Sequence, residues 1–478
     1  MRVFRNEIMT PWRTATHLRY LRYVGVSAVV LLPCWWTAHI QSADFSSHVY
    51  NGWLAILAKS GRANGVYVDL RFTNVLFDWI CEAFARIVGF GPAEHLVASA
   101  LALLFFWSCF AFIASASERT PWHLVPFVAV LTYSRVFYLG FMNFYLATGL
   151  ALAALACVWR VRSRQRFMLA AGLLLLSAVA QPLPPIWAVC IAGYWWAQSR
   201  VGTARRLALF SGSILGLIAV SLLLRANLSS QFGPAKYHLS TGLEQFVPVV
   251  SRTFVISSVV IGCALFVYIL RAVLTSQVVL NLVPVYLLFV CAGVLLPDSA
   301  LPPNTSSFFT LIPLRIGLFS GVLMFAAMGR MRPTRSQLLL AIAAAGLYFA
   351  TLLAYDTKLE NWEERIEAVV STVPQGSRVV AVITDAPFAV RHLIDRACIG
   401  RCYSFANYEP TTGQFRVHVL PGSRSNVDTF FGSLQLQAGR FTVRASDDPL
   451  LEIARCADGD DNLCLRVLHA GDSTAPLH

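Results

Sequence analysis

Apolar residues gather in long runs along most of the first 355 positions, and short polar or basic segments separate these runs. Eleven of the runs approach the roughly 20 residues that cross a bilayer as a helix. Only 13% of the chain is charged, about half the share of an average soluble protein. The pattern predicts a polytopic α-helical membrane protein with about eleven spans, at 21–38, 94–116, 122–138, 139–159, 167–181, 184–198, 207–224, 248–270, 277–297, 308–328 and 337–354.

Arginines set the expected orientation of these spans. Cytoplasmic loops are enriched in Lys and Arg, and alternation from a cytoplasmic N-terminus places every arginine cluster on that side. The clusters are Arg2, Arg5, Arg13, Arg19 and Arg22, then Arg160, Arg162, Arg164 and Arg166, then Arg200, Arg205 and Arg206, then Arg271, then Arg330, Arg332 and Arg335. The net charge of +13 is therefore a topology signal, and no nucleic-acid partner is expected.

The N-terminal residues 1–20 are expected to form a cytoplasmic segment ahead of an uncleaved anchor in the plasma or inner membrane. A signal peptide is the alternative, but Gln41 would put a bulky residue at the −3 position of the nearest plausible cleavage site. Residues 21–355 are expected to form the transmembrane domain, with a first outer loop at 39–93.

Two helices are predicted in this outer loop. In a helix over 44–59, Asp44, His48 and Asn51 share one face. Phe45 and Val49 begin a broad apolar side, which predicts a helix in the membrane interface with its acid directed into a polar chamber. The stretch 74–90 contains Asp78, Glu82 and Arg86, each costing roughly 2.5–3.5 kcal/mol at the bilayer centre. It is therefore expected to lie on the outer surface, with its acids solvated.

Other polar side chains gather at the same outer face, while the middles of the spans contain almost no ionisable groups. A secondary transporter usually keeps charges near the midplane. A chamber at the outer surface instead suits a substrate with its head in this layer and its tail in lipid, and arginines there suit a phosphate. The candidate substrate-binding residues are Arg135, Asn143, Gln181, His238, Arg252 and Arg315.

Residues 356–478 have the composition of a soluble domain, and it is expected on the extracytoplasmic side. "SRVVAVI" and "QFRVHVL" predict strands and "FAVRHLIDRA" predicts a helix, which together favour a small α/β domain. Four cysteines in an oxidising compartment predict two disulfides, with three pairings open and free thiols as the alternative. They are Cys398, Cys402, Cys456 and Cys464.

Several roles are open for the two polar residues of the first loop. Asp44 could act as a general base toward an acceptor hydroxyl or amine, bind a divalent cation such as Mg²⁺ or Mn²⁺, or cap its helix. His48 could take part in catalysis or hold the structure by a hydrogen bond. The sequence contains no P-loop, GxSxG or HExxH motif.

A first span followed closely by an acid on an outer-loop helix ("SADFSSH") resembles the GT-C superfamily of integral-membrane glycosyltransferases. The second amphipathic helix in the same loop, the many spans and the exported C-terminal domain strengthen the resemblance. It implies a polyprenyl-phosphate-linked sugar donor, a catalytic or metal-binding role for Asp44, and phosphate binding by Arg135, Arg252 and Arg315. Many members carry two acids in this loop, whereas Phe45 follows Asp44 here; His48 or Asp69 is the candidate to complete the site.

The leading hypothesis is a membrane glycosyltransferase that moves a hexosyl or pentosyl group to an extracytoplasmic acceptor. The alternatives are a transporter or flippase for a lipid-linked or anionic solute, and a non-catalytic protein of envelope assembly. The expected partners are the bilayer, the lipid-phosphate-linked donor and the acceptor.

Overall fold

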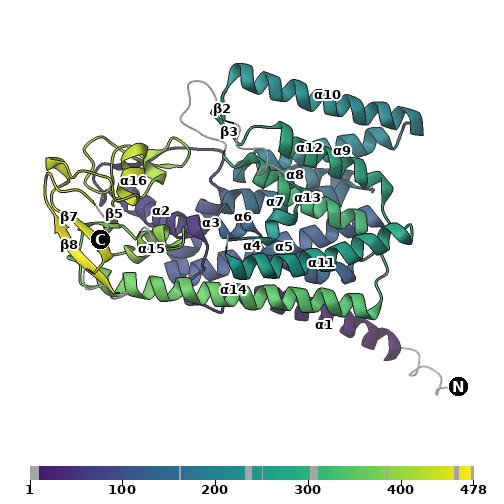
Figure 1. Cartoon of the computed structure of the whole chain (residues 1–478), viewed down its shortest axis with the longest axis horizontal. Coiled ribbons are helices and arrows are strands. Elements are labelled where there is room, and N and C mark those ends of the chain that lie inside the picture. Colours follow the sequence, from purple (N-terminus) through teal and green to yellow (C-terminus); the bar gives the residue numbers. More distant parts are fainter. Residues whose placement is uncertain are drawn as a thin grey trace.

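The computed structural model describes residues 10–160, 163–231, 240–249, 251–301, 310–383, 386–456 and 462–474. Long helices lie side by side in one part of the molecule, here called the helical part (Figure 1). A smaller part with the main β-sheet, here called the soluble part, covers one end of them.

Each apolar run predicted as a span contains a helix. The helices are α1 (Thr10–Leu31), α4 (Phe90–Ser117), α5 (Val125–Thr132), α6 (Arg135–Tyr138), α7 (Met142–Val158), α8 (Arg164–Ala180), α9 (Leu183–Gln198), α10 (Thr203–Asn227), α11 (Arg252–Leu274), α12 (Val283–Leu295), α13 (Ile312–Met328) and α14 (Arg335–Val370). Within the described residues, α4, α10, α11 and α14 are long and apolar enough to cross a membrane. This agrees with a helical membrane protein, and the count of eleven spans stays a prediction.

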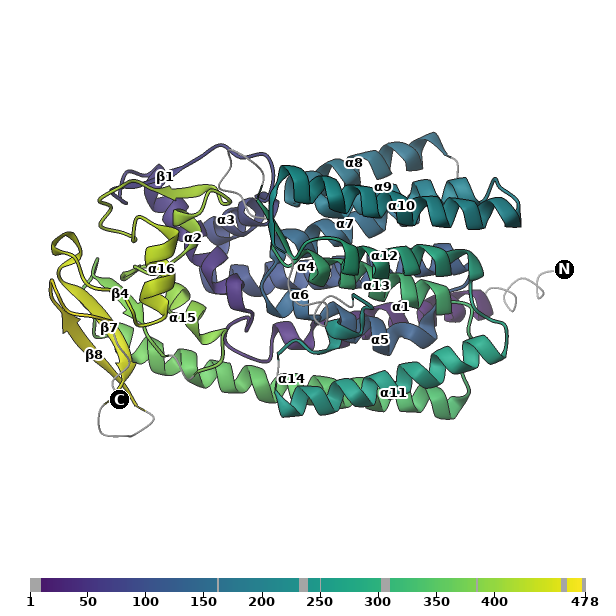
Figure 2. The ribbon, with the colours of Figure 1, turned by 45° about the horizontal axis from the view of Figure 1, so that its top comes forward.

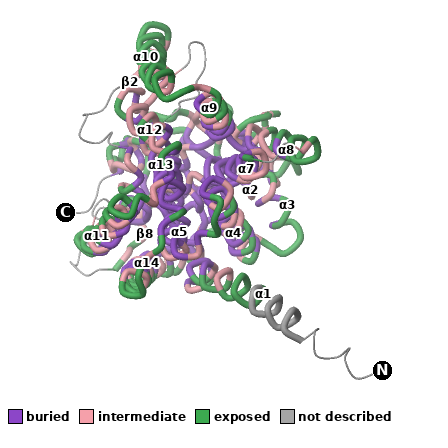
Figure 3. The backbone as a smooth tube through the Cα atoms, turned by 90° about the vertical axis from the view of Figure 1, so that its right-hand side faces the viewer, coloured by how far each residue is buried: buried purple, intermediate pink, exposed green. Residues whose placement is uncertain are grey.

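The helical part has a buried centre and an apolar exterior. Viewed along the helices, α5, α7 and α13 lie in the centre, and α8, α10, α11 and α14 form the exposed rim (Figure 3). Helix α10 has one buried residue, Ser221, although its exterior carries leucine and isoleucine side chains. A continuous apolar exterior of this kind is what a bilayer covers.

The run 122–138 is not one continuous helix, as the sequence predicted. Helix α5 ends at Thr132, Ser134 is extended, and α6 starts at Arg135. Backbone carbonyls freed at such a break need hydrogen-bond donors. Tyr145 donates to the Thr132 carbonyl at 2.9 Å and Tyr348 to the Tyr133 carbonyl at 2.6 Å, so buried hydroxyls stabilise the interruption.

The arginine clusters of separate connections meet at the end far from the soluble part (Figure 2). Arg330 donates to Glu118 at 2.8 Å, and Arg160 pairs with the same carboxylate. Arg271 donates to the Arg332 carbonyl at 2.9 Å. Helices α7, α11 and α13 run from the soluble part toward this end, and the predicted cytoplasmic location of these arginines stays a prediction.

The soluble part is a small α/β unit, as predicted. Its sheet has the order β5-β4-β7-β8, with β4 parallel to β5 and β7, and β8 antiparallel to β7. The strands are β4 (Arg378–Ala381), β5 (Tyr403–Ser404), β7 (Leu450–Arg455) and β8 (Leu463–Leu468), with helices α15 (Val390–Ala397) and α16 (Phe430–Gln437). The expected boundary at 355/356 falls inside α14, which carries the chain from one part into the other.

The first outer loop joins this unit. It forms α2 (Ala43–Lys59), β1 (Val66–Val68) and α3 (Leu76–Val88), and β1 pairs antiparallel with β6 (Val417–Val419). A second pair, β2 (Ser229–Gln231) with β3 (Ser299–Leu301), links two loops of the helical part. The prediction that α2 lies in the membrane interface is wrong: Phe45 and Val49 pack into the core of the helical part, and Tyr50 and Leu54 into that of the soluble part.

The acids of α3 are also buried, although the sequence predicted a solvated face. Asp78 and Glu82 are 6% and 5% exposed. Glu82 accepts hydrogen bonds from Lys59 at 2.8 Å and Arg86 at 2.7 Å, and it also pairs with Arg416 of the soluble part. Cations from three segments thus offset the cost of burying the Glu82 carboxylate.

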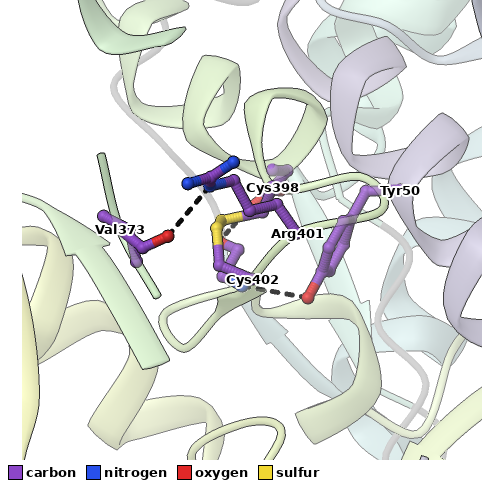
Figure 4. Close-up of a disulfide and its surroundings, with 7 residues drawn as sticks. Tyr50, Val373, Cys398, Arg401 and Cys402 are labelled. Carbon is purple, nitrogen blue, oxygen red and sulfur yellow. Dashed lines mark hydrogen bonds between the residues drawn. A yellow bond between two sulfur atoms is a disulfide. The ribbon is translucent and has the colours of Figure 1, made fainter. Parts of the chain in front are cut away.

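The four cysteines of the soluble part form two disulfides, Cys398–Cys402 and Cys456–Cys464. The sequence predicted two disulfides but left three pairings open, and the structure has this one. The first closes the turn between α15 and β5 (Figure 4). Beside it, Arg401 donates to the Val373 carbonyl at 2.9 Å, and Tyr50 of α2 accepts from the Ser404 amide at 2.9 Å. The turn is therefore tied both to the end of α14 and to α2.

A buried arginine holds the two parts together. Arg396 of α15 donates to Glu363 of α14 at 2.6 and 2.7 Å, to Glu94 of α4 at 2.9 Å, and to the Ile40 carbonyl at 3.1 Å. Both carboxylates are 1% exposed or less. A buried charge is tolerated when it is paired and hydrogen-bonded. This guanidinium donates hydrogen bonds to acceptors on three segments of the chain.

Replacing Arg396 with Gln should destabilise the protein by about 3–5 kcal/mol, because two buried carboxylates lose their cation. Thermal unfolding in detergent measures the loss, and limited proteolysis at the end of α14 should show the soluble part released. Arg391→Gln is the matched control, since Arg391 lies on the same helix and stacks on Phe388 instead. Equal stability of the two variants would contradict the assignment.

Candidate functional site

Asp44 lies in the first turn of α2, but it does not cap the helix. The N-cap is Ser42, whose hydroxyl donates to the Phe137 carbonyl at 2.7 Å. The Asp44 amide donates to the Leu139 carbonyl at 3.3 Å. The capping hypothesis is therefore wrong, and the Asp44 carboxylate is available for another role.

A tight turn presses against this start of α2. Gly140 has φ +80°, and a Cβ there would lie 2.5 Å from the Asp44 nitrogen and 2.7 Å from the Phe45 nitrogen. Only a glycine gives both the left-handed backbone and the space. The Leu139–Gly140 turn therefore fixes where Asp44 begins its helix.

The carboxylate faces a cavity of about 350 Å³, here called the Asp44 cavity. Three other residues singled out from the sequence line the same cavity: His48, Asn143 and Arg315. The remaining wall contains both hydrogen-bonding side chains and aromatic rings: Asn74, Tyr408, Thr412, Gln414, Phe141, Phe144, Phe415 and Phe430. Its volume is within the usual range of small-molecule sites.

Arg315 brings a cation to this cavity, and the charge of Asp44 attracts it without forming an ion pair. It lies in the first turn of α13, with its guanidinium carbon 4.5 Å from the Phe141 ring centroid and 5.2 Å from that of Phe144. Its Nε is buried without a hydrogen-bond partner among the described residues, which also provide no ion pair for it. The rings hold the guanidinium in place by cation–π contact, and its donors remain free for an anion.

The soluble part completes the site around Asp44. His392 of α15 places Nε2 3.5 Å from Asp44 Oδ1, and its Nδ1 lies 3.0 Å from the Ser47 hydroxyl. Ser47 in turn donates to Asp395 at 2.6 Å. Tyr408 is half-buried beside the carboxylate, and its pKa is raised first by desolvation and then by the charge of Asp44. Asp44 is thus held between a histidine and a tyrosine from the other part.

His48 belongs to a buried cluster of charges behind the cavity wall. Its Nδ1 lies 2.9 Å from Asp78 Oδ1 and 3.6 Å from Glu409 Oε1. Asn143 donates to the other oxygen of Asp78 at 2.8 Å and accepts from the Phe77 amide at 2.9 Å. These contacts give His48 and Asn143 a structural role, which joins α2, α3 and α7 in addition to forming the wall.

The charge state of this cluster follows from its geometry. Burial alone would lower the pKa of His48, but the neighbouring Glu409 and Asp78 raise it to about 9. Burial raises the pKa of Glu409 to about 8, against the opposing effect of His48. Burial raises the pKa of Asp78, but the charge and hydrogen bond of His48, the charge of Arg416 and the hydrogen bond from Asn143 together outweigh burial and lower it. At neutral pH the cluster therefore holds a cationic His48, an ionised Asp78 and a protonated Glu409.

The other sequence candidates lie elsewhere. Arg135 lines a second cavity of about 940 Å³, here called the Arg135 cavity, which lies on the other side of the Leu139–Gly140 turn. Gln181 accepts from the Leu183 amide at 2.7 Å and closes the turn between α8 and α9. Arg252 is exposed at the start of α11 and lines neither cavity. His238 lies outside the described residues.

The residues that sequence reasoning missed come mainly from the soluble part. A signal was present in α15, where His392, Asp395 and Arg396 share one face of a short helix and are all buried. A polar face of this kind indicates that another segment of the chain provides hydrogen-bond or ion-pair partners for it. Tyr408 and Glu409 lie at the start of a single 3-10 turn (Glu409–Thr411), which is too short to give a periodic signal.

A divalent cation has limited support at Asp44. Among the described residues, the one group of three close potential ligands is His39, Glu363 and Glu367, and Asp44 is not part of it. Glu363 already accepts two hydrogen bonds from Arg396. Asp69, the second acid considered for the site, lies with Arg71 and His418 outside the Asp44 cavity.

Comparisons of the chain with protein families, with characterised proteins and with solved structures find no match.

Replacing Gly140 with Ala should displace the start of α2 and abolish any activity that depends on Asp44. Gly400→Ala is the matched control, because Gly400 has φ +81° and open space around its Cα. The free energy of unfolding of that control should fall by about 1–2 kcal/mol, because alanine disfavours the left-handed backbone. The fall for Gly140→Ala should be clearly larger. Thermal unfolding in detergent compares the two, and equal losses would show that the contact with Asp44 carries no weight.

Replacing Glu409 with Gln should flatten the pH dependence of stability. Between about pH 4.5 and 8 the folded protein keeps a proton on Glu409 that the unfolded chain has lost, so the wild type loses stability as pH rises. The slope for one proton is at most about 1.4 kcal/mol per pH unit. The groups that face Glu409 are His48, Asp78, Asp44 and Asp395.

The difference should be clearest between about pH 5 and 6.5, because His48 adds a slope of the same sign above its unfolded pKa of 6.5. Thermal unfolding across this range provides the measurement. Glu364→Gln, an exposed acid on α14, should keep the wild-type slope. A Glu409→Gln variant with the same slope would overturn the buried, protonated state of Glu409.

Proposed function

We propose that this protein is a membrane glycosyltransferase that moves a sugar from a polyprenyl-phosphate carrier to an extracytoplasmic acceptor. One observation carries the proposal: the Asp44 carboxylate and the unpartnered Arg315 guanidinium face the same small cavity. A transfer of this kind needs a base for the acceptor and a cation for the phosphate that leaves. The resemblance of the first loop in the sequence to GT-C enzymes is the second reason for the proposal, as an analogy.

The lining of the Asp44 cavity suits a sugar ring. Asn74, Thr412 and Gln414 offer amide and hydroxyl groups for sugar hydroxyls. Phe415 and Phe430 offer apolar ring faces for the C–H side of the ring. A cavity with a few polar groups among aromatic walls fixes orientation as well as affinity.

The chemical step uses each charged group once. The acceptor hydroxyl loses its proton to Asp44 as its oxygen forms a bond to the anomeric carbon of the sugar. The bond from that carbon to the phosphate oxygen breaks, and polyprenyl phosphate leaves with the electron pair. Arg315 stabilises the charge that develops on this phosphate. His392, 3.5 Å from Asp44, orients the carboxylate.

The proposal assigns Asp44 the role of base rather than of cation ligand, because no second ligating acid accompanies it in the described residues. A bound Mg²⁺ or Mn²⁺ would instead require the donor phosphate to complete its coordination. Activity in excess EDTA separates the two roles of Asp44.

Replacing Asp44 with Asn should lower the rate of transfer by about 10²–10⁴-fold, the usual contribution of a general base. Asn keeps the shape of the side chain, so the unfolding temperature should stay close to that of the wild type. The assay follows free polyprenyl phosphate released from a panel of polyprenyl-phosphate pentoses and hexoses by the protein in proteoliposomes. Asp69→Asn, an acid of the same loop outside the cavity, is the control and should retain activity.

A second variant makes the result harder to explain by misfolding. Arg315→Gln should raise KM for the carrier more than it lowers kcat, since the guanidinium contacts phosphate before the reaction as well as during it. Arg252→Gln, at the start of the neighbouring α11, should change neither constant. Wild-type transfer by Asp44→Asn, or carrier flux across the bilayer without any transfer, would end the proposal.

A further inference from the structure

The Arg135 cavity is the larger of the two cavities next to Asp44, and the proposed reaction does not use it. It lies between the start of α11, the second half of α14, α6 and the segment that precedes α15. The Leu139–Gly140 turn, closed against Asp44, separates it from the Asp44 cavity. A ligand in the Arg135 cavity would contact Ala43 but not the Asp44 carboxylate.

The lining of the cavity is mostly apolar and includes two cations. Ala350, Ala354, Val249 and Phe388 are among its apolar residues, and Phe388 is 56% exposed. Arg135 and Lys358 are its cations. Among the described residues neither cation has a hydrogen bond or an ion pair; Glu244 attracts Arg135, but its carboxylate accepts from the Gly242 amide at 2.9 Å. Gln41 adds an Oε1 without a partner in the described part.

The position of these groups along α14 matches the layers of a bilayer. At 1.5 Å per residue, Ala350 lies roughly 22 Å and Lys358 roughly 35 Å from the start of the helix at Arg335. The hydrocarbon core is about 30 Å thick. Ala350 is therefore level with acyl chains of the leaflet nearest the soluble part, and Lys358 is level with its phosphates.

From these observations we infer that the Arg135 cavity binds a glycerophospholipid with an anionic headgroup. Its phosphate pairs with Arg135 and Lys358, and one acyl chain lies along α11 and α14. The lipid enters from the bilayer, because α11 and α14 expose apolar side chains beside the cavity, among them Val255, Ile256, Leu347 and Leu353. A bound lipid would fill the junction where α14 passes from the helical part to the soluble part.

The test uses the full-length protein in phosphatidylcholine nanodiscs that contain a small fraction of photoactivatable phosphatidylglycerol, with a diazirine in one acyl chain. After irradiation, mass spectrometry should locate the label on the stretch around Ala350–Ala354 and on Phe388. Ala354→Trp fills the cavity and should lower this labelling at least fivefold. Thr357→Trp is the matched control, because Thr357 is exposed on the same helix and does not line the cavity.

The charge requirement is tested separately. The double variant Arg135→Gln with Lys358→Gln should lose most of the labelling, whereas Arg315→Gln should keep it. A diazirine phosphatidylcholine of the same chain length should label the cavity severalfold less. Equal labelling by this neutral probe, or no effect of Ala354→Trp, would show ordinary annular lipid and overturn the inference.

Two further outcomes keep this inference distinct from the proposed function. If a few mole percent of polyprenyl phosphate displaced the phosphatidylglycerol probe, the cavity would belong to the donor carrier, and the glycerophospholipid assignment would fail. Asp44→Asn should retain full labelling, since its carboxylate faces the other cavity. Loss of transfer in that variant together with unchanged labelling would support both proposals independently.

Discussion

The contact between Arg396 and the two carboxylates Glu94 and Glu363 is the interaction on which the arrangement of the site depends. It joins α15 of the soluble part to α4 and α14 of the helical part, and its three side chains are at most 5% exposed. Charges in such a place are stable only with their partners in position. The soluble part therefore has one favourable position on the helices. A displacement from it would leave the carboxylates of Glu94 and Glu363 without their cation.

This constraint explains why one site can draw residues from both parts. Arg396 lies one helical turn from His392. The contacts that fix the position of Arg396 therefore also bring His392 to Asp44. The disulfide Cys398–Cys402 and the bond from Ser404 to Tyr50 fix the following turn against α2. Tyr408 and Glu409 come after that turn; Tyr408 lines the cavity beside Asp44, and Glu409 lies behind its wall near His48. A first-loop helix expected at the membrane surface is in this way enclosed between two cores.

The sequence predicted what depends on local pattern and on sidedness. Apolar runs placed the helices, the first-loop helix put Asp44 and His48 on one face, and depth along a span selected Arg315. Sidedness, however, orders residues along the membrane normal and not around the bundle. The sequence placed Arg135 and Arg315 at the same outer face, but they line different cavities, and only packing decides that. His392 and Tyr408, more than 340 positions from Asp44, are brought to it by tertiary contacts that no periodicity records.

The Leu139–Gly140 turn gives the two cavities separate tasks. Because Gly140 lies in contact with the backbone of Asp44, the turn is both the wall between the cavities and the support of the carboxylate. On one side are aromatic rings, amides and a free guanidinium, which suit a polar ring with a phosphate. On the other side are a mostly apolar lining and two cations, which suit a lipid. A ligand in the larger cavity would press on Ala43 and so bear on the position of Asp44 without touching its charge; coupling between the two cavities would then act through the start of α2.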